Sequence, residues 1–254
     1  MIDQSAPSQL DALIENARLI TQLRNIAQLA DRLKEKQCRL RPSVGSFGLI
    51  SYSDDTPQRG FSNIRSPSRL TTKLEVAIQP PRRLTREKRL QSWLIRSAFS
   101  NKGEMISLSR CLGGKFWLVS DEIAIKAPRD QSSNVPNLVA DLLLIAEDDG
   151  GNAGFVNVEL KSSRLKKTFD QVTTFRSLLE DKGLISRWRK FAEIMIGDAL
   201  RWKESPETRG IVIWPKSEDP KRAAANKWRG EYERIDLIGY NETLSPDRYS
   251  LECE

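Results

Sequence analysis

The sequence predicts an α/β protein in which helices flank a central sheet and a helical extension precedes it. Two apolar segments, 138–146 and 155–161, have the length and composition of buried strands, and the turn 148–152 between them is Asp-Asp-Gly-Gly-Asn. A turn of this composition favours a β-hairpin. Helical periodicity before and after the hairpin is typical of helices packed on a sheet.

Residues 8–36 are predicted to form one long helix or a helical hairpin, because their leucines, isoleucines and alanines recur near a helical period. The apolar stripe either packs on the core of the same chain or forms an interface with a second copy or another protein partner. Its high alanine content does not favour a coiled coil.

Residues 40–83 are rich in Ser, Pro, Arg and Gly and are expected to be irregular, with short strands at 47–52 and 73–78. The pair Pro80-Pro81 ends regular structure. We therefore predict an N-terminal extension at 1–80 and a second domain at 81–254.

In the second domain a helix is expected from Thr85, a favourable N-cap residue, to Phe99. The further elements expected in chain order are strands at 105–108, 115–119 and 122–126, the two hairpin strands, helices at 168–182 and 184–203, a strand at 210–214, a basic helix around 219–229 and a last strand at 234–240. Residues after Asn241 are expected to be irregular.

The composition is that of a soluble globular protein: 254 residues, 39% apolar and 30% charged. No apolar segment approaches the length of a membrane span, and the N-terminus lacks the pattern of a signal peptide. The cysteines, Cys38, Cys111 and Cys253, are odd in number and far apart. We expect reduced thiols and a cytoplasmic protein.

Histidine is absent from the chain. This excludes Ser-His-Asp and Cys-His hydrolases, histidine-ligated zinc enzymes and nucleases that use a histidine base. The sequence also contains no Walker loop and no dinucleotide-binding fingerprint. Any hydrolysis must therefore depend on carboxylates, lysine and a hard metal ion.

The net charge is +7, and a basic cluster between Thr56 and Arg96 contains ten Lys or Arg residues against the two acids Glu75 and Glu87. Such a cluster is either a solvated surface or a surface that contacts phosphates, and we favour DNA as the partner. Trp188 and Trp228 lie among later basic residues. They either stack on unpaired bases or anchor helices to the core.

Asp141 lies inside the first apolar hairpin strand, and Glu159 and Lys161 lie on the second. A buried carboxylate is costly unless it is paired or binds a metal. Side chains alternate along a strand, so Glu159 and Lys161 share one face, and adjacent strands would bring all three together. Two hard oxygen ligands beside an ammonium suit Mg²⁺ or Mn²⁺ and an attacking water.

Glu87 lies at the start of the helix that follows Thr85, three residues before Leu90 and seven before Leu94. It therefore projects towards the apolar stripe of that helix. The carboxylate either joins the metal site or serves only as a favourable partner for the helix dipole.

The residues Glu87, Asp141 and Glu159-Leu160-Lys161, in this order of elements, resemble the PD-(D/E)XK nuclease superfamily over about residues 84–240. The resemblance implies a restriction-endonuclease-like core, with a central mixed sheet of four to five strands flanked by helices. Ala140 stands where the motif has proline.

The resemblance also implies roles for these residues. Asp141, Glu159 and the carbonyl of Leu160 would hold the metal, Lys161 would orient the attacking water, and Glu87 would hold a second metal or tune the first. The segment from Gln171 to Phe175 is similar to the Gln-x-x-x-Tyr element of the RecB-type branch, with Phe in place of Tyr. Gln171 would then orient metal ligands or touch a phosphate, unless it is an ordinary exposed residue.

The function expected is a metal-dependent deoxyribonuclease, an endonuclease of restriction, anti-phage defence or a mobile element. Two alternatives remain. One is a catalytically silent nucleic-acid-binding module or subunit of a larger assembly, and the other is a scaffold in which residues 8–36 bind a partner.

Overall fold

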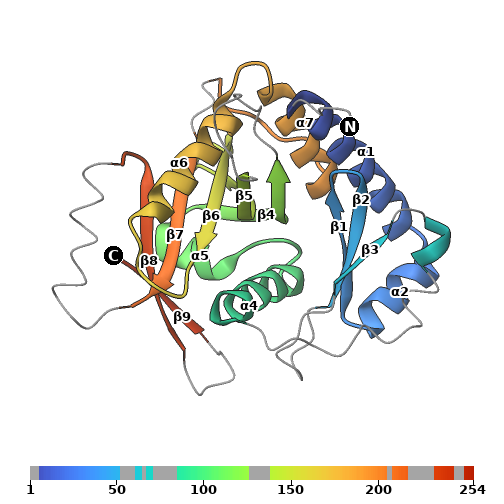
Figure 1. The fold of residues 1–254 in the computed structure, drawn as a ribbon, viewed down its shortest axis with the longest axis horizontal. Helices are drawn as coiled ribbons and strands as arrows, with labels where there is room; N and C mark the ends of the chain where they lie inside the picture. Colours follow the sequence, from blue (N-terminus) through green and yellow to red (C-terminus); the bar gives the residue numbers. More distant parts are fainter. Residues whose placement is uncertain are drawn as a thin grey trace, which may run out of the picture. The chain divides into compact units, whose positions relative to one another are not determined.

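The structure, a computed structural model, describes residues 6–51, 61–64, 67–70, 85–125, 138–204, 208–216, 232–242 and 249–254 (Figure 1). The chain forms two compact units. Unit 1 contains Met1–Thr85, Ala124–Asn137 and Ser186–Asp198, and unit 2 contains Arg86–Ile123, Leu138–Ile185 and Ala199–Glu254. The expected boundary at Pro80-Pro81 lies outside the described residues. In the described part of the chain, no helix is long and apolar enough to cross a membrane.

Unit 1 is built on a three-stranded antiparallel sheet with the order β1-β2-β3. Its elements are α1 (Ala6–Arg24), α2 (Ala27–Glu35), β1 (Cys38–Ser43), β2 (Ser46–Ser51), β3 (Phe61–Ile64), the short helix η1 (Pro67–Arg69) and most of α7 (Ile185–Ile196). The N-terminal prediction is confirmed as two helices, and β2 confirms the strand expected at 47–52. β1 and β3 were not predicted, and the strand expected at 73–78 lies outside the described residues.

The apolar stripe of α1 is buried within the chain, including Leu10, Leu13 and Ile20. Ile20 packs with Leu40 and Phe47 of the small sheet. The structure thus accounts for this stripe as core, and an interface with a second copy stays a prediction.

Unit 2 contains a mixed six-stranded sheet with the order β4-β5-β6-β7-β8-β9. The strands are β4 (Lys115–Ile125), β5 (Leu138–Glu147), β6 (Ala153–Leu160), β7 (Arg209–Pro215), β8 (Ile235–Glu242) and β9 (Tyr249–Cys253). β5 and β6 form the predicted hairpin, β6, β7 and β8 are parallel, and β9 returns antiparallel to β8.

Helices cover both faces of this sheet. On one face, α4 (Arg86–Ser100) and α5 (Ile106–Leu112) supply residues such as Leu94 and Leu108 to a core with Leu144 and Val158. On the other face, α6 (Lys167–Glu180) packs Phe169 and Val172 against Val212 and Trp214. The predicted α/β class with a mixed central sheet is confirmed, although the sheet has six strands where four to five were expected.

Three local predictions in unit 2 are wrong. The strand expected at 105–108 is the start of α5, because Met105 and Leu108 enter the core at helical spacing. The strands expected at 115–119 and 122–126 form the single strand β4, as far as the chain is described. The tail after Asn241 includes β9, which depends on hydrogen bonds to β8.

Other predicted elements agree or lie outside the described part. The helix after Thr85 is confirmed as α4, and the helix expected at 168–182 is confirmed as α6. The helix expected at 184–203 is the shorter α7. The basic helix around 219–229 lies outside the described residues.

Cys111 of α5 and Cys253 of β9 form a disulfide bond, with their Cα atoms 5.8 Å apart. The prediction of three reduced thiols is therefore wrong for this pair, while Cys38 is free and buried. The two partners are 142 residues apart in sequence. They meet because α5 packs against β9, a contact that no local pattern indicates.

Candidate active site

A carboxylate pair lies where β5 begins and β6 ends. The register pairs Leu142 with Val158, so the next residues outward, Asp141 and Glu159, are neighbours across the two strands. The apolar neighbours of these residues decide their direction. Leu142 and Val158 enter the core under α4 and α5, which turns Asp141 and Glu159 to the opposite side of the sheet.

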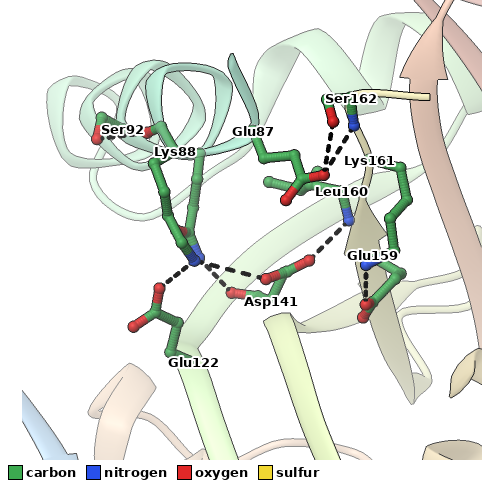
Figure 2. Close-up of polar contacts among 10 residues, drawn as sticks. Glu87, Lys88, Ser92, Glu122, Asp141, Glu159, Leu160, Lys161 and Ser162 are labelled. Atoms are coloured by element: carbon green, nitrogen blue, oxygen red, sulfur yellow. Dashed lines mark hydrogen bonds and ion pairs between the residues drawn. The ribbon is translucent and has the colours of Figure 1, made fainter. Parts of the chain in front are cut away.

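Asp141 is held at both carboxylate oxygens and at its own backbone carbonyl (Figure 2). Its Oδ2 accepts a hydrogen bond from the Leu160 amide at 2.9 Å, and the Lys88 ammonium lies 3.7 Å from Oδ1. The Gln91 side-chain amide donates to the Asp141 carbonyl at 2.8 Å. The side chain therefore has a defined orientation.

Glu159 is paired with Lys161, two residues later and directly after the end of β6. The Lys161 ammonium lies 2.5 Å from Glu159 Oε1. The side chain of Glu159 is only 6% exposed, so this pair lies in a region of low dielectric constant. The predicted meeting of Asp141, Glu159 and Lys161 is found in the structure.

Burial and like charge both disturb the ionisation of these carboxylates. Burial, with the nearby charge of Asp141 as the second cause, raises the pKa of Glu159 to about 7 from its ordinary 4.5, against the opposing effect of Lys161. Burial also raises the pKa of Asp141, although Lys88 and the Leu160 amide act in the opposite direction. Neighbouring acids whose pKa values are both raised are typical of functional sites.

Glu87 projects from the start of α4 to the residue that follows Lys161. Its Oε1 accepts hydrogen bonds from the Ser162 amide at 2.8 Å and from the Ser162 hydroxyl at 3.1 Å. Its charge also contributes to the raised pKa of Glu159. Glu87 therefore lies beside the carboxylate pair.

Two candidate residues are placed differently from the others. Leu160 lies between Glu159 and Lys161, with its side chain buried towards α4 and its amide bound to Asp141. Gln171 is exposed on α6, and none of the described contacts that hold the carboxylates involves it. The structure therefore does not bring Gln171 into the cluster.

Sequence analysis missed Lys88 and Glu122, which form an ion pair beside Asp141. The hydrogen bond from Gln91 to the Asp141 carbonyl was not foreseen either. The signal for Lys88 was its spacing of three residues from Gln91, which puts both on one helical face. No local signal identified Glu122, because it comes from a strand with no sequence link to α4.

The donor set fits a hard divalent cation. In the described residues, no three acidic or cysteine side chains converge as a complete metal cage would require. Asp141 and Glu159 nevertheless offer carboxylate oxygens, the donors that Mg²⁺ and Mn²⁺ prefer. A bound cation would stabilise the ionised form of both carboxylates, whose pKa values are raised chiefly by burial, and Mg²⁺ commonly keeps several waters in its coordination shell.

The predicted basic surface is only partly described. Five of its ten cations lie outside the described residues: Arg59, Arg65, Lys73, Arg82 and Arg83. Arg86 and Arg89 both pair with Glu242. Trp188 is fully buried, which supports the core role among the two considered, and Trp228 lies outside the described residues.

A hollow of about 460 Å³ lies at the other end of β5 and β6, lined in part by Phe116 and Phe155. Its basic residues Lys203, Arg209 and Arg234 pair with Asp148, Asp236 and Glu180. Because the basic residues of this hollow are already paired, the carboxylate pair is the stronger candidate site.

Comparisons of the chain with protein-family models, with curated proteins and with solved structures found no match. The functional interpretation therefore depends on the residues and their geometry.

Proposed function

We propose that this protein is a metal-dependent nuclease that hydrolyses DNA phosphodiester bonds. The observation that carries the proposal is the pair formed by the buried Glu159 and the half-buried Asp141, whose pKa values are both raised, with the Lys161 ammonium against Glu159. The site holds four carboxylates, Glu87, Glu122, Asp141 and Glu159, against the two lysines Lys88 and Lys161, so it carries more acid than its ion pairs need.

The order of elements supports the proposal. α4 is followed by the neighbouring strands β4, β5 and β6, then by α6 and the parallel strand β7. This is the order expected for a restriction-endonuclease-like core, with Asp141 on its second strand, Glu159 on its third and Lys161 directly after the third. Restriction, anti-phage defence or a mobile element is the setting that the resemblance implies.

In the proposed mechanism, Asp141, Glu159 and the Leu160 carbonyl would hold Mg²⁺ or Mn²⁺. The cation, when bound, supplies Lewis acidity at the phosphate and lowers the pKa of water. Lys161 orients the attacking water and offsets the negative charge that develops on the phosphate. Glu87 fixes the Ser162 backbone directly after Lys161, and so holds the end of β6 in place.

A cleavage assay on plasmid and on single-stranded DNA, with Mg²⁺, Mn²⁺ or EDTA, tests the proposal. Asp141→Asn, Glu159→Gln and Lys161→Met should each reduce metal-dependent cleavage by about a hundredfold. Glu35→Gln, on an exposed position of α2, is the matched control and should cleave like the wild type.

Two results would change this conclusion. If all three folded variants cleave as fast as the wild type, the active site lies elsewhere or the activity is a contaminant. If the wild type binds DNA in a salt-dependent manner but cleaves with none of the metals, the protein is instead a silent nucleic-acid-binding module.

A further inference from the structure

Lys88 lies between two carboxylates that come from different strands (Figure 2). Its ammonium pairs with Glu122 of β4, lies 3.7 Å from Asp141 Oδ1, and donates to the Gln91 side-chain oxygen at 3.1 Å. The side chain of Lys88 is about one-third exposed. The ammonium is therefore shared between two acids at the border of the site.

α4 contacts both the main chain and the side chain of Asp141. Gln91 binds the Asp141 carbonyl, and Lys88, one turn earlier, approaches Oδ1. The Leu160 amide binds the other oxygen, Oδ2. Among the described contacts, the Lys88 ammonium is the one that lies against Oδ1 and therefore limits the access of another cation to this oxygen.

Glu122 has an unusual backbone conformation for its place within β4. Its φ is +46°, in the left-handed region that disfavours residues with a β-carbon. Such strain concentrates at functional sites. A partly exposed ion pair stabilises a fold too little to explain this geometry, so we attribute the placement of Glu122 to its effect on Lys88.

We propose that Lys88 is a positioning residue for Asp141, and that Glu122 sets how strongly Lys88 occupies Oδ1 and hence the affinity of the carboxylate pair for a divalent cation. This inference rests on the proposed function, in which Asp141 is a ligand of the cation. The Lys88 ammonium competes for Oδ1 and repels a second cation. Glu122 draws the ammonium away and adds an attractive charge, so the two residues act in opposite directions.

The test is calorimetric titration of the full chain with Mn²⁺ in the absence of DNA. Lys88→Met should bind Mn²⁺ about tenfold more tightly than the wild type, and Glu122→Gln about tenfold more weakly. The double variant should lie close to the wild type. Lys182→Met, an exposed lysine beyond α6, is the control and should not change the affinity.

The outcomes separate this inference from the proposed function. Wild-type binding with both single variants unchanged, or weakened alike, would overturn the positioning role and leave the metal site intact. No Mn²⁺ binding to the wild type, with Asp141→Asn giving the same trace, would overturn the metal site and the inference together. If Lys88→Met does not fold, the isosteric Glu122→Gln carries the test by itself.

Discussion

The ionisation of Glu159 makes the stability of this protein depend on pH in a direction that can be measured without any activity. The pKa of Glu159 is raised to about 7 in the folded chain, against an ordinary value of 4.5. Between these two values the folded state binds more protons than the unfolded state, so the free energy of unfolding falls as the pH rises. The contribution of protonated Glu159 to stability is therefore complete below pH 4.5 and is lost as the pH rises through 7.

The size of this effect follows from the difference between the two pKa values. One pKa unit corresponds to about 1.4 kcal/mol, so ionising Glu159 in the folded state costs on the order of 3 kcal/mol by pH 8. Glu159→Gln has no charge to lose and should remove this dependence. The difference in unfolding free energy between Glu159→Gln and the wild type should therefore shift in favour of the variant by this amount between about pH 5 and pH 8.

Urea unfolding at several pH values, followed by tryptophan fluorescence, gives the required free energies. Glu159→Gln also leaves Lys161 with an amide partner, which costs the same free energy at every pH. This cost cancels when the changes in unfolding free energy with pH are compared between the variant and the wild type. Glu35→Gln should give a curve parallel to the wild type. At pH 8, Mg²⁺ should stabilise the wild type and not Glu159→Gln. Parallel curves for Glu159→Gln and the wild type would refute the reasoning.

Three further predictions use other contacts. Glu87→Gln should reduce cleavage about tenfold, because it removes a negative charge that acts on Glu159, while leaving stability within about 0.5 kcal/mol, since an amide oxygen can still accept from Ser162; unchanged cleavage would remove Glu87 from the site. Glu122→Gly should be more stable to urea than Glu122→Ala by on the order of 1 kcal/mol, because only glycine tolerates φ +46° freely. Equal stability of the two variants would show that the backbone at this position is not strained. Replacing Cys111 or Cys253 by Ser should lower the unfolding free energy by on the order of 3 kcal/mol, because the disulfide closes a loop between residues 142 apart; a wild-type melting temperature unaffected by dithiothreitol would contradict the bond.

Local sequence determined the central hairpin and the main acidic residues. Alternation along β6 put Glu159 and Lys161 on one face, and the apolar neighbours of Asp141 made β5 a buried strand. These features depend on residues one or two positions apart. Which residues share a face is therefore decided locally, whereas the side of the sheet that they occupy depends on the core under α4 and α5.

Longer-range features came only from the tertiary structure. A four-residue apolar segment such as 105–108 suits a short strand or the start of a helix, and only packing against the sheet decided for α5. β9 exists because β8 offers it an open edge, and the disulfide between Cys111 and Cys253 follows from that pairing.

The candidate site shows the same division. The sequence determined which carboxylates and which lysine of the hairpin share a face, because strand geometry repeats every two residues. Only the tertiary structure decided that Lys88 of α4 and Glu122 of β4 complete the charge arrangement around Asp141. Ion pairs between separate elements depend on where each backbone is held, and that position is set by the whole core rather than by any segment of the chain.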